Sequence, residues 1–333
     1  MSKNIKNNQI ISIAGATATG KTQLALQLAN YLIDQGQAEH VYLLSLDSRQ
    51  VYQGLEVLTG ADIPHHFQRQ AAKQNYDYWQ NAAGTISLHG TSIIPIWQDW
   101  SAAHCYRLYQ SLSKQLSSKD YLILVGGTGF YQRQIHQPAA SLLTKPNPQL
   151  RSRLEKYDLA KLQQILQKLD TNKWHSMNQS DRANPRRLIR AIELATLSQA
   201  KPNTQGQSAT AQTNSTAQVS TIYLQLNASQ RQQLIIKRVE QRFHDAMQEV
   251  KACLKQFELA DNLPAASATG FQELVAYLKH QATKEQTLKQ WQTREIQYAK
   301  RQDTWWKQES DLIKLDAAAP QLLQQTLATL KLL

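Results

Sequence analysis

An eight-residue run near the start of the chain has the residue types and spacing that hold phosphate groups. It fits the pattern G-x-x-x-x-G-K-[ST] and consists of Gly15, Ala16, Thr17, Ala18, Thr19, Gly20, Lys21 and Thr22. Glycines let the N–H groups of such a loop point at an anion, and the helix that follows adds partial positive charge. Lys21 can reach an outer phosphate, and the Thr22 hydroxyl can hold Mg²⁺ or a phosphate oxygen. We therefore expect residues 15–22, the phosphate loop, to bind a phosphate group together with Mg²⁺.

Two other apolar segments end in polar residues that could join the phosphate loop. Residues 40–46 are followed by Asp47, Ser48, Arg49 and Gln50, and residues 121–125 by Gly126, Gly127 and Thr128. Open α/β sheets build their sites at the carboxyl ends of parallel strands, so Asp47 should face the crevice of the phosphate loop. There it could accept a proton, bind Mg²⁺ or accept a hydrogen bond. Position alone leaves a simple helix N-cap open for Asp47 and Thr128.

The residues after 121–125 also bear on the reaction class. In many P-loop NTPases this strand ends in an Asp that serves Mg²⁺. Here Gly126, Gly127 and Thr128 stand in its place. The missing acid argues against an ordinary nucleotide kinase, while the glycines permit a close approach of the backbone.

The pattern of apolar residues predicts the elements that position these groups. Four short apolar runs with amphipathic sequence between them predict a P-loop NTPase-like α/β fold, a parallel sheet flanked by helices; they are 9–14, 40–46, 121–125 and 221–226. Residues 146–198 have apolar side chains at helical spacing and predict an all-helical insertion. The core then comprises 1–145 and 219–333, with long helices at about 229–258, 267–280, 284–309 and 318–331. The polar tract 200–218 predicts a mobile loop, and residues 65–100 show no clear period.

The charge of the chain suggests a polyanionic partner. Its 37 Lys and Arg against 25 Asp and Glu give a net charge of +12, which suits nucleic acid first and an acidic membrane second. Basic residues cluster at 182–190, at 231–242 and at 294–307, where Tyr and paired Trp residues are interleaved. That mixture suits phosphate contacts with base stacking, although a solvated helix face remains the alternative for any single cluster.

Other features of the sequence narrow the class further. Cys105 and Cys253 have no partner pattern, so neither a disulfide framework nor a cysteine zinc site is indicated. The first ten residues are polar, and no apolar stretch approaches 18 residues. We therefore expect a cytoplasmic protein without a membrane span.

Taken together, these motifs resemble one enzyme family. The segments GATATGKT, LDSRQVYQG, VGGTGFY, NPRRLIRAIEL, ATGFQEL and QYAKRQDTWW occur in this order between Ile10 and Lys307. They are similar to those of the tRNA dimethylallyltransferases, also called tRNA isopentenyltransferases. The resemblance implies transfer of a dimethylallyl group from dimethylallyl diphosphate to the N6 amine of an adenosine. That adenosine lies just 3′ of the anticodon in tRNAs that read codons beginning with U. The family also implies Mg²⁺ and a monomer.

The resemblance implies roles for individual residues. Asp47 would be the general base, with Thr128 beside the reacting adenosine, and the phosphate loop with Arg231 would hold the diphosphate. The implied tRNA contacts are Asp47, Ser48, Arg49, Gln50, Thr128, Asn184, Pro185, Arg186, Arg187, Leu188, Gly270, Phe271, Gln272, Lys300, Arg301, Gln302, Asp303, Thr304, Trp305, Trp306 and Lys307.

The chain departs from the family pattern at several points. Residues 58–64 read Leu-Thr-Gly-Ala-Asp-Ile-Pro where the family usually has Ile-Gly-Thr-Ala-Lys-Pro, and Phe130 stands where Leu is usual. Other readings of the sequence are a P-loop small-molecule kinase, a prenyltransferase that acts on free adenine nucleotides, and a non-catalytic RNA-binding protein.

Overall fold

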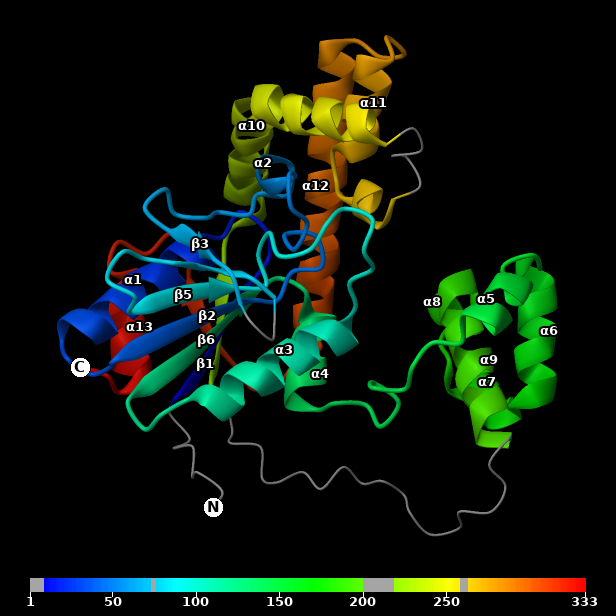
Figure 1. Ribbon diagram of the computed structural model, residues 1–333, viewed down its shortest axis with the longest axis horizontal. Helices are drawn as coiled ribbons and strands as arrows, with labels where there is room; N and C mark the ends of the chain where they lie inside the picture. Colours follow the sequence, from blue (N-terminus) through cyan, green and yellow to red (C-terminus); the bar gives the residue numbers. More distant parts are fainter. Residues whose placement is uncertain (1–8, 73–75, 200–218, 258–262) are drawn as a thin grey trace. The chain divides into compact units, whose positions relative to one another are not determined.

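The computed structural model describes residues 9–72, 76–199, 219–257 and 263–333. These residues form two compact units (Figure 1). The first contains the described residues before 139 and after 218, and the second contains residues 139–199. The tract 200–218, predicted as a mobile loop, lies outside the described residues.

An eight-stranded sheet forms the centre of the first unit, in the order β3-β4-β5-β2-β6-β1-β7-β8. The strands are β1 (Ile10–Gly15), β2 (His40–Ser45), β3 (Gln68–Gln70), β4 (Tyr78–Gln80), β5 (Ile86–His89), β6 (Asp120–Gly126), β7 (Thr221–Gln225) and β8 (Leu312–Asp316). The four predicted strands are β1, β2, β6 and β7. The expectation of a wholly parallel sheet is wrong at one edge, because β4 is antiparallel to both β3 and β5.

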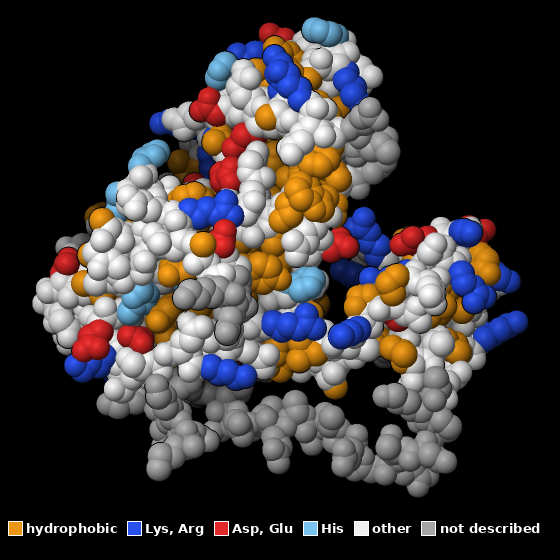
Figure 2. All heavy atoms as spheres, viewed as in Figure 1, with side chains coloured by type: hydrophobic (Ala, Val, Ile, Leu, Met, Phe, Trp, Pro, Cys, Tyr) orange, Lys and Arg blue, Asp and Glu red, His pale blue; other side chains and the backbone are white. Residues whose placement is uncertain are grey.

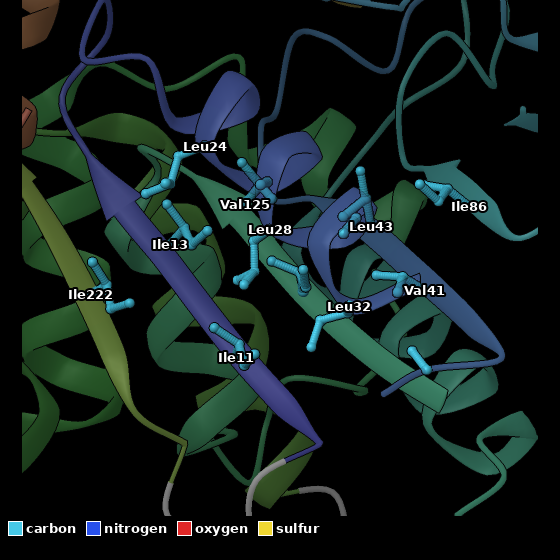
Figure 3. Packing of buried hydrophobic residues seen from close by; sticks show 14 of the residues in the cluster. Ile11, Ile13, Leu24, Leu28, Leu32, Val41, Leu43, Ile86, Val125 and Ile222 are labelled. Carbon is cyan, nitrogen blue, oxygen red and sulfur yellow. The ribbon is translucent and has the colours of Figure 1, made fainter. Parts of the chain in front are cut away.

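One face of the sheet is covered by α1 (Lys21–Asp34) and α13 (Leu322–Leu330). Leu24, Leu28 and Leu32 recur every four residues, so they form one apolar stripe along α1. This stripe packs against Ile11 and Ile13, which point the same way because side chains alternate along a strand (Figure 3). The packing fixes the start of α1, and with it the phosphate loop, against β1.

The opposite face of the sheet is covered by α4 (Gly129–His136) and α12 (Lys284–Trp306). Ser12, which alternates with Ile11 and Ile13, accepts a hydrogen bond from Gln132 of α4. Farther along β1, Ala14 packs with Tyr223 and with Trp306 at the end of α12. Because of this packing, α12 lies beside the carboxyl end of β1.

The remaining helices of the first unit are α2 (Glu56–Thr59), α3 (Ala102–Gln115), α10 (Ala228–Gln256) and α11 (Phe271–Leu278), with a 3-10 turn at Pro264–Ser267. The helices predicted at 229–258 and 284–309 correspond to α10 and α12. Helix α10 packs against α2, α11 and α12. No helix in the described part of the chain is both long and apolar enough to cross a membrane.

The second unit is helical, as predicted for residues 146–198. Its helices are α5 (Pro148–Leu154), α6 (Leu159–Leu169), α7 (Thr171–Ser176), α8 (Gln179–Arg182) and α9 (Pro185–Gln199). They enclose a small core that includes Leu162, Leu166, Leu188 and Ile192. On the face seen in Figure 2, Lys and Arg side chains occur on both units, which agrees with the net charge of +12.

Candidate active site

The strands β1, β2 and β6 are parallel neighbours, so their carboxyl ends meet at one edge of the sheet. The phosphate loop follows β1, Asp47 follows β2, and Gly126-Gly127 end β6. A cavity of about 690 Å³ opens there, and residues from all three segments line it. The prediction that Asp47 and the phosphate loop share one crevice is therefore confirmed.

Within the phosphate loop, the side chains divide into those that shape it and those that face the cavity. Thr19 is buried, and its hydroxyl donates to the carbonyl of Ala16 (2.9 Å). Lys21 Nζ donates to the same carbonyl (2.7 Å). The cavity-lining members of the loop are Thr17, Ala18, Gly20, Lys21 and Thr22. The other three members of the loop do not line the cavity and shape the loop from within; they are Gly15, Ala16 and Thr19.

Lys21 has an unusual electrostatic environment. Burial, followed by the nearby charge of Arg238, lowers the pKa of its ammonium group to about 8, while Asp47 and Asp62 act in the opposite direction. Part of the Lys21 population therefore loses its charge in mildly alkaline solution. An anion beside Nζ would favour the charged form.

Asp47 is held by a local turn. Its Oδ1 accepts from the N–H of Arg49 (2.7 Å) and from the N–H of Gln50 (3.3 Å). Such turns are typical of Asp, whose short side chain reaches the backbone two residues on. This side chain also lines the cavity. The carboxylate is thus oriented, and Oδ2 accepts neither of these two bonds.

Thr128 and Tyr298 lie together near the cavity. Thr128 is the residue just before α4, its side chain makes no capping hydrogen bond, and its hydroxyl lies 3.5 Å from the Tyr298 hydroxyl. Tyr298 of α12 lines the cavity, whereas Thr128 is not among the described residues that line it. Burial, with a smaller contribution from the Asp47 charge, raises the pKa of Tyr298. Tyr298 therefore carries a neutral hydroxyl at neutral pH. Thr128 does not line the cavity itself and contacts it only through Tyr298.

The positive charge opposite the phosphate loop comes from residues that the sequence did not assign. Arg238 and Arg242 of α10 line the cavity. A Cβ atom at Gly60 would lie 2.1 Å from Arg238 Nη2, so glycine there leaves room for the guanidinium. Arg242 Nη1 donates to the Val57 carbonyl (3.2 Å), and burial with the neighbouring Arg238 lowers its pKa to about 10. A pKa of about 10 still leaves the Arg242 guanidinium cationic at neutral pH.

Arg231, predicted as the diphosphate ligand, lies elsewhere. Its side chain is buried and forms a two-pronged ion pair with Asp303 (3.1 Å and 2.5 Å). It is not among the described residues that line the cavity. The hydroxyl of Tyr223 also donates to Asp303 (3.0 Å). We correct the prediction: Arg231 joins α10 to α12, and Arg238 with Arg242 supply the charge at the cavity.

The segment 300–307 of α12 has two sides, although the sequence predicted RNA contacts throughout. Gln302 is buried and accepts from the N–H of Thr17 in the phosphate loop (2.8 Å). Trp306 is buried and donates to the Gly127 carbonyl (3.3 Å). On the exposed side lie Lys300, Arg301, Thr304 and Lys307. Gln302 and Trp306 therefore hold the phosphate loop and Gly127 in place, and among the predicted RNA contacts of this segment Lys300, Arg301, Thr304 and Lys307 are accessible.

Burial also corrects two other predicted RNA contacts. Leu188 lies in the core of the helical unit, and Phe271 is fully buried at the start of α11. Gly270, just before it, packs on Trp291, while Gln272 is partly exposed. Among the predicted residues of the helical unit, Pro185, Arg186 and Arg187 are exposed and Asn184 is partly so. Ser48, Arg49 and Gln50 line the cavity.

The donors present fit Mg²⁺ held mainly through a substrate. Across the described residues, no three His, Cys, Asp or Glu side chains gather into a metal cluster. The Thr22 hydroxyl and the Asp47 carboxylate both line the cavity. Mg²⁺ commonly takes one or two protein ligands and fills its remaining positions with substrate phosphates and water.

Comparison with known proteins identifies the family of this site. The family model described as IPP transferase matches residues 50–309, well over half of the chain. The chain belongs to this family. The tRNA dimethylallyltransferase of Gloeobacter violaceus is 30% identical over 324 residues, which cover 95% of each chain. The tRNA dimethylallyltransferase 1 of Porphyromonas gingivalis is also 30% identical and covers 90% of this chain and 89% of its own.

Solved structures show the same fold. The full-length tRNA isopentenylpyrophosphate transferase of Bacillus halodurans aligns with a TM-score of 0.60 at 22% identity, covering 97% of this chain and 95% of its own. A eukaryotic dimethylallyltransferase acting on tRNA aligns with a TM-score of 0.67 at 20% identity, covering 96% and 77%. The predicted resemblance is thus confirmed, and the chain is an enzyme of the prenyltransferase type.

We expect Gln302→Ala to weaken diphosphate binding without unfolding the protein. The change leaves the Thr17 N–H without its buried partner, which costs enough to let the phosphate loop shift. The KM for the prenyl diphosphate should rise about tenfold, since a lost partner of this kind is worth about 1–3 kcal/mol. Steady-state kinetics measure the effect, with exposed Gln297→Ala on the same helix as the control. An unchanged KM would contradict this role of Gln302.

Proposed function

We propose that this enzyme transfers the dimethylallyl group of dimethylallyl diphosphate to the N6 amine of the adenosine that lies 3′ of the anticodon, in tRNAs that read codons beginning with U. The observation that carries the proposal is one cavity with two kinds of lining. Lys21, Arg238 and Arg242 supply positive charge around the phosphate loop, and the oriented carboxylate of Asp47 faces the same space. A diphosphate leaving group and a base for an amine need these two kinds of group.

The reaction that follows from this lining balances without a further reactant. The N6 lone pair attacks C1 of the dimethylallyl group, the C–O bond to diphosphate breaks, and its electron pair leaves on the diphosphate. The amine nitrogen then loses a proton to Asp47, which is the general base. The phosphate-loop N–H groups, Lys21 and the two arginines stabilise the charge that develops on the leaving oxygen. Mg²⁺, held by Thr22 and the diphosphate, would supply further charge neutralisation there.

An RNA acceptor is supported by the charge of the chain and by the names of its relatives. The net charge of +12 exceeds what a small anionic substrate requires. Relatives over the whole length are named tRNA dimethylallyltransferases. An adenosine in an anticodon loop must leave the base stack to enter an enclosed site. The exposed Arg186 and Arg187 of the helical unit suit phosphate contacts that hold such a loop.

The test is a transfer assay with purified protein. Labelled dimethylallyl diphosphate, Mg²⁺ and unmodified tRNA with adenosine at the target position are combined, and nuclease digestion locates the label. The control tRNA carries guanosine at that position. Label on the target adenosine and none on the control supports the proposal. Label on free AMP or ADP but not on tRNA would instead assign the enzyme to free adenine nucleotides.

The lowered pKa of Lys21 predicts a pH dependence of substrate binding. The diphosphate favours charged Lys21, so binding takes up a proton once the pH exceeds about 8, the pKa of the free enzyme. The KM for dimethylallyl diphosphate should be flat below that pH and rise by up to about tenfold per pH unit above it. Kinetics between about pH 6.5 and 9.5 measure the profile. Lys21→Arg, whose guanidinium keeps its charge, should flatten the profile; a flat wild-type profile would refute the assignment.

Arg242, which lines the cavity, and Arg231, which pairs with Asp303, should have different effects on kinetics and stability when they are replaced. Arg242→Gln removes a cavity cation, so the KM for dimethylallyl diphosphate should rise about 10- to 100-fold, the value of a charge-assisted hydrogen bond. Arg231→Gln should leave that KM nearly unchanged and lower the thermal midpoint, because it breaks the buried pair with Asp303. Kinetics and thermal unfolding of both variants decide. The reverse pattern would restore Arg231 as the diphosphate ligand.

A further inference from the structure

An exposed aromatic side chain stands at the carboxyl edge of the sheet, close to the site but outside the cavity lining. Phe130 is 48% exposed, at the second position of α4. It follows Thr128 by two residues, and Thr128 contacts the cavity residue Tyr298. A single exposed apolar side chain needs no explanation. The neighbours of Phe130 are what give it significance.

Trp305 of α12 lies beside Phe130 and is packed against Gly129 and Arg133. The two rings are perpendicular, with centroids 6.4 Å apart. Trp305 packs so closely on Gly129 that a Cβ there would lie 1.9 Å from Trp305 Cδ1. The guanidinium of Arg133 covers the Trp305 ring at 4.4 Å and is itself paired with Glu309 (3.1 Å from Nε to Oε1). The ring of Phe130 is therefore supported from one side and open on the other.

This aromatic pair continues a stripe that begins in the cavity. Tyr298, Arg301 and Trp305 follow one another at helical spacing along α12, so they share one face. The first two line the cavity. Arg301, four residues before Trp305, and Arg133, whose guanidinium covers the Trp305 ring, are the cations beside this face. An open aromatic face flanked by cations matches an unpaired nucleobase with its phosphates, because bases stack on aromatic rings while Lys and Arg neutralise the backbone.

We propose that Phe130 and Trp305 form a stacking shelf for an unpaired nucleobase adjoining the target adenosine. The proposal rests on the proposed function for its RNA. When the target base leaves the stack to enter the cavity, its neighbour loses a stacking partner. The shelf replaces that partner and so stabilises the opened loop. Phe130 is thus a residue for RNA recognition, and it takes no part in handling the diphosphate.

The test compares three variants on an anticodon stem-loop. Phe130→Ala removes the stacking face, Phe130→Tyr keeps it, and Leu234→Ala removes a similarly exposed apolar side chain from α10 (46% exposed). The adenosine next to the target is replaced by the fluorescent base 2-aminopurine, whose emission is quenched by stacking. We compare the 2-aminopurine emission of the bound stem-loop between the variants and wild type, and we measure the KM for RNA, the KM for dimethylallyl diphosphate and the thermal midpoint.

We expect the bound 2-aminopurine to emit more strongly with Phe130→Ala than with wild type, because it then lacks a stacking partner, and the KM for RNA to rise about tenfold, the typical loss for one stacked base. The KM for dimethylallyl diphosphate and the thermal midpoint should not change, and Phe130→Tyr and Leu234→Ala should behave as wild type. Equal quenching and equal KM for RNA in Phe130→Ala and wild type would overturn the shelf. The same holds if Leu234→Ala has the same effect, or if Phe130→Ala lowers the thermal midpoint and Phe130→Tyr shares its loss of affinity.

Failure of the proposed function looks different. In that case the wild-type enzyme would label no RNA, while the quenching experiment would still report whether Phe130 stacks a base in the bound stem-loop.

Discussion

Replacing Asp47 with Asn should reduce prenyl transfer by about 10²- to 10⁴-fold, the range expected for loss of a general base. In the proposed reaction, the amide cannot accept the proton that N6 loses. It still offers Oδ1 to the N–H groups of Arg49 and Gln50, so the turn that positions residues 47–50 is retained. Binding of tRNA should therefore change by less than about twofold. Single-turnover assays and a separate binding titration measure the two quantities.

Two further variants sharpen this experiment. Asp47→Ala removes the base and the turn acceptor together, so it should lose tRNA affinity as well as turnover. Asp34→Asn makes the same chemical change at the exposed end of α1 and should leave both quantities as in wild type. If Asp47→Asn keeps near-normal turnover, the proton leaves by another route and Asp47 only shapes the turn.

The phosphate loop and Asp47 were predictable because the signal for each is local. A short apolar run followed by G-x-x-x-x-G-K-T contains both the strand and the loop, and parallel strands in one sheet bring their carboxyl ends together. Four strands were found in this way. The short strands Gln68–Gln70 and Tyr78–Gln80 carry polar residues and cover three residues each, too few for a period to be visible. For that reason the antiparallel edge of the sheet was missed.

The cationic side of the site could not be read from the sequence, for a different reason. Arg231, Arg238 and Arg242 lie on one long helix, and the sequence alone does not state which turn of that helix meets the cavity. In the structure, Arg231 forms an ion pair with Asp303, whereas Arg238 and Arg242 line the cavity. Arg231 and Arg238 are seven residues apart, about two helical turns, which is consistent with a shared face of α10. Their different roles are therefore set by the neighbours that each arginine meets along the helix.

The basic and aromatic residues at 300–307 show the same limit of sequence reasoning. A basic and aromatic run reads as a nucleic-acid surface, yet helical geometry turns every third or fourth residue inward. Gln302 and Trp306 are inward and hold the phosphate loop and the Gly127 carbonyl. The same segment therefore supports the phosphate loop and presents Arg301 and Trp305 on its other side. One helix thus connects the phosphate loop with the pair of Phe130 and Trp305.

Replacing Glu193 with Ala should destabilise the helical unit by about 3–5 kcal/mol, the cost of breaking a buried ion pair on one side. Glu193 is fully buried in α9, and its carboxylate accepts from Arg151 (3.0 and 2.8 Å), Arg190 and the N–H of Asn147. Arg190 also donates to the carbonyls of Ser141 and Thr144 (3.0 Å each). The variant leaves two guanidinium groups without their anion and frees the segment before α5. Hydrogen exchange should accelerate in peptides from 148–199.

The pH dependence of this network has a definite sign. Burial alone would raise the pKa of Glu193, but hydrogen bonds from Arg151, Asn147 and Arg190 lower it to about 2. A carboxylate whose folded-state pKa lies below the unfolded value stabilises the fold above the unfolded pKa. That contribution is lost as the pH falls from about 4.5 to about 2. The stability gap between wild type and Glu193→Gln should therefore narrow over this range, as urea unfolding can measure, while exposed Glu155→Ala should show no such gap. A gap that stays constant with pH would mean that Glu193 stabilises the unit by packing, and that its charge contributes little.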